Sequence, residues 1–327
     1  MKSGRRLALV FALSLLPLAL YCQSAGAGSS GHQVQNYKVT ILSTMLADEG
    51  IGEWGFSALL EVDGRQILID TGARPETVLK NATELKVDLS PVEDVVLTHF
   101  HGDHTGGLMS LRTELMKKNP AALSRAHVGR GFFWPRPSAQ GERNSMIEIR
   151  KQYEKTGGKF VEHEQWSELL PGVWLTGPVP RVTDEKNYGG RGVAKVQTPD
   201  GIREDNVPDD QSVIIETKDG LLMITGCGHA GVVNILKYTH VKFPDSPITT
   251  LFGGLHLYDA SDKQLSWTAD QFKLFGVREL VGAHCTGIDA LFQLRQRLNL
   301  SRKTAVVGAV GATYVSGKGI HPGEIAQ

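Results

Sequence analysis

The chain has 327 residues, of which 41% are hydrophobic and 21% are charged, an ordinary globular composition. This composition excludes a disordered, a collagen-like and a polytopic membrane protein. Lys and Arg together number 35, as do Asp and Glu. Without an excess of basic charge for a phosphate backbone, no nucleic-acid partner is expected. The three cysteines, Cys22, Cys227 and Cys285, are too few for a disulfide framework.

The first 27 residues are predicted to be a secretory signal peptide. Three basic residues precede an apolar run over 7–20, which is short for a membrane span. An Ala-x-Ala sequence allows cleavage after Ala27. We therefore expect one exported bacterial domain over 28–327, periplasmic or extracellular. A retained N-terminal anchor and a lipid anchor at Cys22 are alternatives, and no other membrane contact is expected.

Between residues 37 and 117 the pattern alternates between strands and helices. Asp63-Gly64 separates two β-rich runs and predicts a hairpin. The expected strands are 37–43, 56–62, 66–70 and 95–98, and the expected helices are 76–85 and 108–117. The segment 119–165 is polar, irregular and rich in Arg and Gly, and it is interpreted as an insertion.

The second half of the chain repeats this alternation. Lys218-Asp219-Gly220 predicts another hairpin, and Ser261 and Gly276 are the expected cap residues of one helix. The expected strands are 173–176, 212–217, 221–225, 249–253, 280–283 and a last one at 304–310; the expected helices are 232–238, 261–276 and 288–298. The pattern predicts an α/β (α+β) domain whose sheets carry helices on their outer faces.

The strongest chemical signal is the run Thr98-His-Phe-His-Gly-Asp-His-Thr-Gly-Gly107, which follows a short buried strand. His99 and His101 project to one side of an extended chain. Asp103 and His104 can then turn toward a second point. Imidazole and carboxylate groups at this density suit zinc or a similar first-row metal.

This run resembles the H-x-H-x-D-H motif of the metallo-β-lactamase superfamily. The resemblance covers about 38–308 and implies a four-layer αββα sandwich with metals at one edge between the sheets. It also implies that Asp70, in Leu-Ile-Asp-Thr-Gly, supports the metal site from behind its ligands, and that His284 is the last ligand.

Four further segments resemble a narrower group, the 7,8-dihydropterin-6-methyl-4-(β-D-ribofuranosyl)aminobenzene-5′-phosphate synthases. They are Trp-Gly-Phe-Ser at 54–57, Thr-Gly-Cys-Gly-His-Ala-Gly at 225–231, Phe-Gly-Gly-Leu-His-Leu at 252–257 and Gly-Ala-His-Cys-Thr-Gly at 282–287. The chain departs from the superfamily in two ways. The region 207–212 lacks the usual histidine, and Cys227 stands where a bridging aspartate is common.

Two divalent metal ions are therefore expected as cofactors, zinc first, with manganese or iron as alternatives. We expect one ion to be held by His99, His101 and His229, and the other by Asp103, His104 and His284. His229 would replace the missing imidazole. Cys227 is either a ligand or a small buried residue beneath the site. His256 is a ligand, a structural group, or, as in related phosphodiesterases, an acid that protonates the leaving oxygen.

The expected reaction is attack by a metal-bound hydroxide, with Asp103 orienting the nucleophile and His256 as the second catalytic residue. Arg130 and Arg181 could clamp a phosphate, and Phe132 and Trp134 could stack on a flat ring. The substrate is expected to be a small molecule. The first hypothesis is an exported hydrolase of a phosphate ester, phosphodiester or diphosphate. The alternatives are a pyrophosphate-releasing transferase, a β-lactamase or lactonase, and a non-catalytic metal-binding protein.

Overall fold

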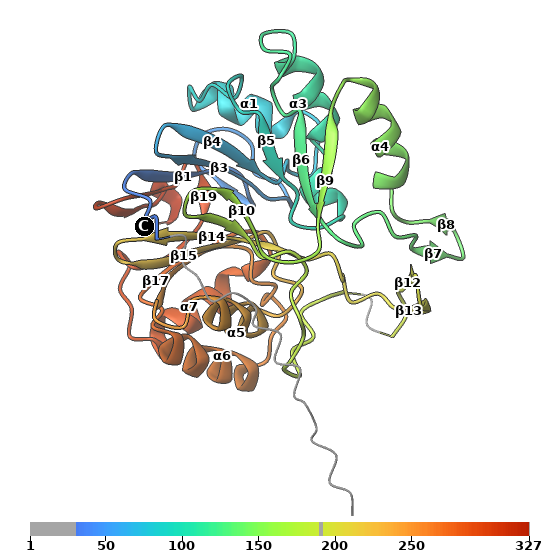
Figure 1. Cartoon of the computed structure of the whole chain (residues 1–327). Coiled ribbons are helices and arrows are strands. Elements are labelled where there is room, and N and C mark those ends of the chain that lie inside the picture. The colour runs from blue at the N-terminus through green and yellow to red at the C-terminus, as the bar shows by residue number, and fades with distance from the viewer. Residues whose placement is uncertain (1–30, 190–191, 327) are drawn as a thin grey trace, which may run out of the picture.

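The computed structural model describes residues 31–189 and 192–326. The signal peptide predicted over 1–27, and Cys22 within it, lie outside the described residues. Two sheets pack face to face, and each carries helices on its outer face (Figure 1). Among the described residues, no helix is both long and apolar enough to span a membrane.

The first sheet has the strand order β21-β20-β1-β3-β4-β5-β6-β9. Its strands are β1 (Tyr37–Ser43), β3 (Ser57–Val62), β4 (Arg65–Ile69), β5 (Asp94–Val96), β6 (Arg125–Gly129), β9 (Lys159–His163), β20 (Thr313–Val315) and β21 (Gly319–His321). β3 and β4 form the predicted hairpin, whereas β4, β5, β6 and β9 run parallel. The helices α1 (Thr77–Glu84), α3 (Leu108–Leu115) and α4 (Met146–Lys155) cover its outer face (Figure 1).

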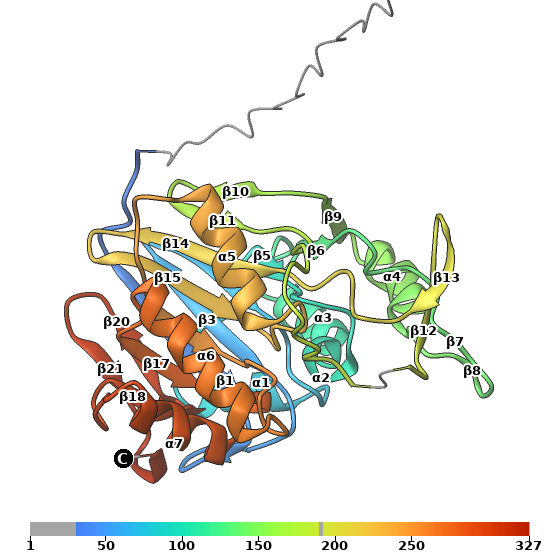
Figure 2. The ribbon, with the colours of Figure 1, turned by 90° about the horizontal axis from the view of Figure 1, so that it is seen from below.

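The second sheet has the strand order β10-β11-β14-β15-β16-β17-β18. Its strands are β10 (Ser167–Leu170), β11 (Val173–Leu175), β14 (Ser212–Thr217), β15 (Gly220–Thr225), β16 (Ile248–Gly253), β17 (Glu279–Gly282) and β18 (Ala305–Val307). β15 to β18 are parallel. The helices α5 (Val232–Lys242), α6 (Asp262–Phe275) and α7 (Ile288–Arg297) lie across its outer face (Figure 2).

Shorter elements connect these layers. They are β2 (Leu46–Ala47), α2 (Gly102–Thr105), β7 (Pro137–Ser138), β8 (Gly141–Glu142), β12 (Lys195–Thr198), β13 (Gly201–Glu204), η1 (His284–Thr286), β19 (Ala309–Val310) and η2 (Glu324–Ala326). α6 begins and ends as predicted, because the Ser261 hydroxyl accepts the Gln264 N–H and Gly276 takes a left-handed conformation.

The core between the sheets is apolar and closed. Ile41 and Leu60 from the first sheet share one cluster with Ile224 and Phe252 from the second, and all four are fully buried. Parallel strands that are covered on both faces read as nearly continuous hydrophobic runs, as β15 and β16 do. The four layers form the αββα sandwich expected from the resemblance.

The interpretation of 119–165 as an irregular insertion is wrong. This segment supplies β6, α4 and β9, and both strands belong to the first sheet. Its polar residues hide the strand pattern because two of them pair with Asp94 on the neighbouring strand. Arg125 makes two contacts of 2.7 Å with Asp94, and His127 Nε2 lies 3.0 Å from the same carboxylate.

The predicted last strand at 304–310 was also incomplete. It divides into β18 and β19, and two further strands follow, β20 and β21, which close the edge of the first sheet beside β1. These strands are only three residues long, which is too short for a period-two pattern to stand out.

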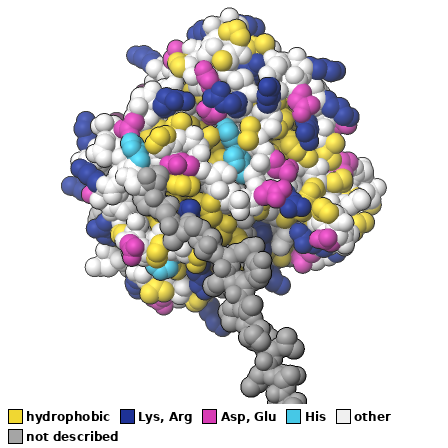
Figure 3. Space-filling model, in the orientation of Figure 1, with side chains coloured by type: hydrophobic (Ala, Val, Ile, Leu, Met, Phe, Trp, Pro, Cys, Tyr) yellow, Lys and Arg dark blue, Asp and Glu magenta, His cyan; other side chains and the backbone are white. Residues whose placement is uncertain are grey.

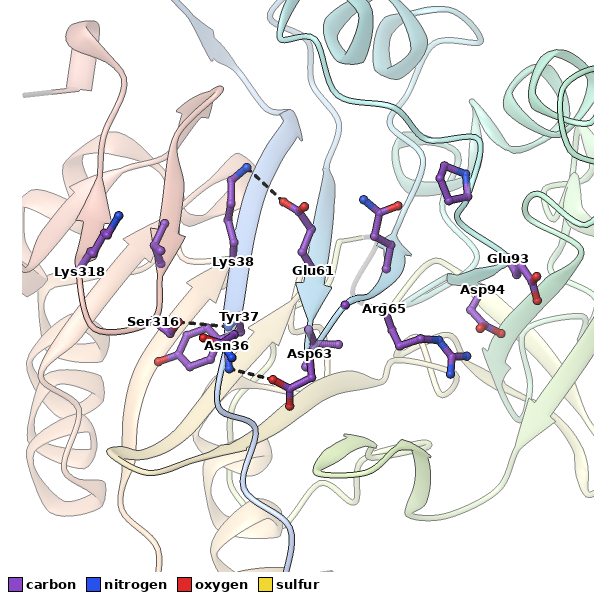
Figure 4. Close-up of a pocket in the computed structure, with 15 residues that line it drawn as sticks. Asn36, Tyr37, Lys38, Glu61, Asp63, Arg65, Glu93, Asp94, Ser316 and Lys318 are labelled. Atoms are coloured by element: carbon purple, nitrogen blue, oxygen red, sulfur yellow. Dashed lines mark hydrogen bonds and ion pairs between the residues drawn. The ribbon is translucent and has the colours of Figure 1, made fainter.

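A groove of about 790 Å³ lies where β4 and β5 begin (Figure 4). Several of its charged side chains are paired: Lys38 Nζ lies 3.1 Å from Glu61 Oε2, and Glu93 and Asp94 pair with Arg125, which lies outside the groove lining. On the face drawn in Figure 3, basic and acidic side chains are interspersed. The residues singled out in the sequence lie at the other end of β4 and β5.

Candidate metal centre

The candidate ligands follow the carboxyl ends of parallel strands in both sheets. β4 is followed by Asp70, β5 by the motif 99–104, β15 by Cys227 and His229, β16 by His256, and β17 by His284. α2 turns the motif immediately after His101, which has an extended backbone. Open α/β sheets bind their ligands at this end of their strands. The centre therefore lies between the two sheets at one edge of the sandwich.

One group consists of His99, His101 and His229. His99 Nε2 lies 3.0 Å from His101 Nδ1. The His229 ring lies 4.7 Å from the His99 ring and 4.9 Å from the His101 ring, between centroids. His229 Nδ1 donates to the backbone carbonyl of Asn187 at 2.6 Å. This bond fixes the ring and leaves Nε2 buried and without a hydrogen-bond partner, as is usual for a histidine whose other nitrogen binds a metal.

The second group consists of Asp103, His104 and His284. Asp103 Oδ2 lies 3.3 Å from His284 Nε2 and 3.9 Å from His104 Nε2. His104 Nδ1 donates to Asp70 Oδ2 at 2.7 Å. The Asp70 carboxylate also accepts the Thr98 N–H at 2.7 Å and the Thr98 hydroxyl at 2.8 Å. Asp70 thus orients His104 from behind.

Cys227 lies between the two groups. Its Sγ is 3.1 Å from His104 Nε2 and 3.2 Å from Cys285 Sγ, and both cysteines are free thiols. Its sulfur forms one compact set of donors with His99 and His229, and another with His104 and His284, with all atoms of each set within 4.8 Å of one another. The thiol therefore stands where one side chain reaches both metal positions.

The unpartnered atoms of these side chains fit a metal ion. His229 Nε2 and His284 Nδ1 are buried and make no hydrogen bond, and His284 Nε2 has only the Asp103 carboxylate beside it, at 3.3 Å. A buried polar atom without a partner costs about 1–3 kcal/mol. A cation in the centre would supply the missing partner, and a set of imidazole, carboxylate and thiolate donors suits zinc and other first-row metals.

Burial keeps three of the histidine rings neutral, the form that binds a metal, whereas the neighbouring carboxylates favour a protonated His104, whose proton a bound metal would displace. Burial lowers the pKa of His101 to about 3, and it holds those of His99 and His229 well below the usual range, so the rings are neutral. Burial also acts against a charged His104, but the carboxylates of Asp70 and Asp103 outweigh it and raise its pKa to about 9. The His104 and His284 rings hold the pKa of Asp103 well below its ordinary value despite burial.

Three residues at the strand ends adopt left-handed backbone conformations. The φ angles are +53° for Asp70, +47° for His256 and +46° for His284. A non-glycine residue in this region costs about 1–2 kcal/mol. Each of these residues lies shortly after the end of a strand, where the left-handed backbone changes the direction of the chain next to the centre.

His256 lies at the edge of the centre. Its ring is 4.5 Å from that of His229, and its Nδ1 makes no hydrogen bond. One of its ring nitrogens also forms a compact donor set with Cys227 and Cys285. His256 is partly exposed, whereas His99, His104 and His284 are buried. The side chain can therefore face both the centre and the solvent.

Arg136 and Asp209, which were not predicted from the sequence, hold the motif in place through contacts with Phe100. The Arg136 guanidinium is 1% exposed, lies 3.6 Å from the centre of the Phe100 ring and pairs with Asp209 at 2.5 Å. The other oxygen of Asp209 accepts the Phe100 N–H at 2.9 Å. Phe100 separates His99 from His101, so this pair holds the turn between two candidate ligands.

Arg181 and Asp210 support the loop of His229. Arg181 donates to the backbone carbonyls of Asn206, Val207 and His229. Asp210 Oδ2 accepts the Ala230 N–H at 2.9 Å. An Asp-Asp pair just before a buried strand was the available sequence signal for Asp209 and Asp210.

Arg130 and its neighbouring aromatics contact residues other than the candidate ligands. Arg130 is half exposed and pairs with Glu164 at 3.4 Å. Phe132 is fully buried and packs against Phe133, 5.1 Å between ring centroids. These contacts attach the 130–134 segment to the body of the fold, and Phe132 offers no face for stacking on a ligand.

Two stacked sheets, helices on both outer faces and a histidine-rich centre at one edge define a metallo-β-lactamase fold. The sequence pattern of the metallo-beta-lactamase superfamily matches residues 55–284. The chain belongs to this superfamily.

Several relatives span most of the chain. The 7,8-dihydropterin-6-methyl-4-(beta-D-ribofuranosyl)-aminobenzene-5'-phosphate synthase of Methanocaldococcus jannaschii is 28% identical over 269 residues, which cover 79% of this chain and 90% of the synthase. The crystal structure of Tm1679, a metal-dependent hydrolase of the beta-lactamase superfamily, superposes with a TM-score of 0.68 and 28% identity, over 85% of this chain and 98% of the other. The Bacillus subtilis protein YhfI shares the fold at 12% identity and a TM-score of 0.52, over 86% of this chain and all of YhfI.

Proposed function

We propose that the chain is an exported metal-dependent hydrolase that cleaves a phosphate ester, phosphodiester or diphosphate. The observation that carries this proposal is the position of Asp103. Its side chain is 25% exposed beside the buried rings of His104 and His284. A carboxylate that is ionised, close to the candidate ligands and open to solvent can orient an attacking water.

The metal ions would be held by the two groups of side chains. His99, His101 and His229 would hold one ion and Asp103, His104 and His284 the other. Cys227 would be a shared or neighbouring ligand. We propose zinc, with manganese or iron as alternatives. When bound, such ions act as Lewis acids and lower the pKa of water to roughly 7.

The protein's own groups would divide the remaining work. Asp103 would accept a hydrogen bond from the attacking water and fix its direction. His256, at the open edge and within 4.5 Å of the His229 ring between centroids, would donate a proton to the leaving oxygen. Asp70 would keep His104 in one orientation throughout.

A pyrophosphate-releasing transferase is the second candidate. It is favoured by the similarity to the Methanocaldococcus jannaschii synthase, which extends over 90% of that enzyme. The same centre would then bind a diphosphate leaving group, and a second organic substrate would take the place of water. An exported chain argues for the hydrolase, and that argument rests on the signal peptide predicted over 1–27.

The two candidates differ in what they need for turnover. The zinc-loaded protein is given p-nitrophenyl phosphate, bis-p-nitrophenyl phosphate, or a dihydropterin diphosphate with and without an aminobenzene ribofuranoside phosphate. The hydrolase releases phosphate, nitrophenol or pyrophosphate without the second substrate. Release that requires the aminobenzene compound identifies the transferase.

The matched variants are Asp103→Asn and Asp184→Asn. Asp184 is an exposed carboxylate on a loop, so its variant should keep full activity. The Asp103→Asn variant should lose at least about 100-fold in kcat, the range of a positioned acid–base group. Equal activity of the two variants would contradict the role of Asp103, and metal content measured on both separates a lost ligand from a lost reaction.

A further inference from the structure

Two exposed aromatic side chains, Trp54 and Tyr258, stand at the mouth of the metal centre. Trp54 is 49% exposed and Tyr258 is 52% exposed. The Trp54 ring lies 4.8 Å from the His284 ring and 5.8 Å from the Tyr258 ring, between centroids. The Tyr258 ring lies 5.3 Å from that of His256. The pair therefore reaches from a candidate metal ligand to the candidate general acid.

The backbone beneath Trp54 is held rigidly. The buried carboxylate of Glu53 accepts the Ser43 hydroxyl at 2.7 Å and the Ala73 N–H at 2.9 Å. A Cβ on Gly55 would stand 2.6 Å from Ala73 N and 2.9 Å from Asp103 O, so the chain there is pressed against the motif loop. The indole nevertheless remains half exposed. The backbone on either side of Trp54 therefore holds the indole in place at the surface.

Tyr258 is fixed in the same way from the second sheet. Its N–H and that of Leu257 both donate to the carbonyl of Cys285, at 3.3 and 3.0 Å. Gly287 has φ +82°, and a Cβ there would stand 2.7 Å from Tyr258 Cα. The strap 257–258 thus packs on the loop that carries His284. Both aromatic residues are attached to backbone that also positions the centre.

The geometry of the two rings suits a flat ligand. Their planes are nearly perpendicular, at 88°. A planar ring placed in such a corner stacks on one face and makes an edge contact with the other, the two arrangements that aromatic rings prefer. A flexible alkyl chain gains only apolar area from the same surface.

We propose that Trp54 and Tyr258 form an aromatic wall that binds a planar ring of the substrate beside the reacting phosphate. This inference rests on the proposed function for the position of that phosphate. Rigid aromatic side chains lose little conformational entropy on binding, which makes them effective contacts. The wall would select aryl or heteroaryl phosphates over alkyl phosphates of similar size.

The test measures binding rather than turnover. Calorimetry on the zinc-loaded protein compares 1-naphthylphosphonate, phenylphosphonate and n-hexylphosphonate, which carry no hydrolysable ester bond. We expect 1-naphthylphosphonate to bind roughly tenfold more tightly than n-hexylphosphonate, the upper end of one aromatic contact. Trp54→Ala and Tyr258→Ala should each reduce this preference to about twofold or less. Trp54→Phe should keep most of it.

Trp267→Ala is the matched control, since Trp267 is 37% exposed on α6 and stands outside this wall. It should leave the preference intact. Zinc content is measured on every variant because Trp54 packs on His284. A variant that loses zinc is not used to judge the preference for the naphthyl compound. If Trp54→Ala loses zinc, Trp54→Phe and Tyr258→Ala test the proposal. An unchanged preference in Tyr258→Ala, tighter binding of the hexyl compound, or no binding of any phosphonate would overturn the proposal.

The outcomes also separate this proposal from the hydrolase proposal. A preference for the naphthyl compound that depends on the wall, in a protein that hydrolyses no phosphoester, keeps the wall and removes the hydrolase. Phosphoester turnover with equal binding of naphthyl and hexyl compounds keeps the hydrolase and removes the wall.

Discussion

Arg136 is a buried guanidinium under the turn between His99 and His101, and its replacement should destabilise the protein strongly. Arg136→Ala leaves Asp209 buried without its cationic partner. Breaking a buried ion pair from one side costs about 3–5 kcal/mol. Urea unfolding should show a loss of that size, and zinc binding should weaken because the turn is no longer held.

Arg130→Ala is the control for this prediction. Arg130 pairs with Glu164 in solvent, and exposed ion pairs contribute about 0–1 kcal/mol. Equal losses of stability in the two variants would show that the Arg136–Asp209 pair does not support the turn. Normal stability of Arg130→Ala with a rise in KM for phosphoesters would restore the original expectation that Arg130 binds substrate.

Cys227 should be the thiolate ligand, and Cys285 should not. Cys227 Sγ belongs to the donor sets of both histidine groups, whereas Cys285 joins only the set with Cys227 and His256. A cobalt(II)-loaded protein should show a thiolate-to-metal charge-transfer band. Cys227→Ser should abolish this band and weaken zinc binding at least about tenfold, the lower end for removal of a supporting group. Cys285→Ser should keep both.

The reverse pattern would contradict this assignment. A band that persists in Cys227→Ser and disappears in Cys285→Ser would make Cys285 the ligand and Cys227 a packing residue. A band absent from the unmodified protein would leave the histidines and Asp103 as the whole ligand set.

At the scale of elements, the first turn of α5 binds a carboxyl group from a distant loop, that of Glu185, whose pKa is raised. Glu185 Oε2 accepts the N–H groups of Val233 and Asn234, but Oε1 has no partner and the side chain is buried. Burial raises the pKa of Glu185 to about 7, although the two backbone bonds act in the other direction.

This pKa makes stability fall with rising pH. Between pH 5 and 7 the folded state keeps a proton on Glu185 that the unfolded chain has released, so the free energy of unfolding decreases across this range. Glu185→Gln keeps an oxygen acceptor for the helix but cannot ionise. The variant should therefore gain about 2–3 kcal/mol relative to the unmodified protein between pH 5 and pH 8.

Urea unfolding at pH 5 and pH 8 checks this expectation. Asp184→Asn, an exposed change on the same loop, should differ from the unmodified protein by the same small amount at both values. A stability difference for Glu185→Gln that does not change with pH would mean that the carboxyl is ionised throughout.

The elements that carry the centre were predictable because their strands are mostly buried apolar runs with a glycine or histidine at their end or within three residues of it. β4, β5, β15, β16 and β17 all lie within one or two residues of the predicted bounds. β6 was missed because its charged residues, Arg125 and His127, pair with Asp94 on the neighbouring strand, and such pairing depends on tertiary contact. Arg136 and Asp209 are 73 positions apart, so a local sequence pattern could not predict that they pair.

At the scale of the whole molecule, the candidate centre joins the two halves of the sandwich. The motif 99–104 follows a strand of the first sheet, whereas Cys227, His229 and His284 follow strands of the second. Two buried apolar faces already hold the sheets together over most of their area. At the edge, the contact consists of imidazole rings, the Asp103 carboxylate and the Cys227 thiol, and some of the imidazole nitrogens have no hydrogen-bond partner. A bound metal would therefore link the two sheets and stabilise their contact, in addition to its role in the reaction.

Removal of metal should lower the stability of the whole chain. A ligand that binds only the folded state adds about 2.7 kcal/mol when its free concentration is one hundred times Kd. A chelator should therefore lower Tm by several degrees, and added zinc should restore it. A His101→Ala, His229→Ala double variant, which lacks two of the donors on one ion, should respond less to the same chelator. If the chelator does not change the Tm of the zinc-loaded protein, the ions bind a preformed edge without stabilising the contact between the sheets. If it lowers the Tm of the double variant by the same amount, the stabilising metal is bound elsewhere.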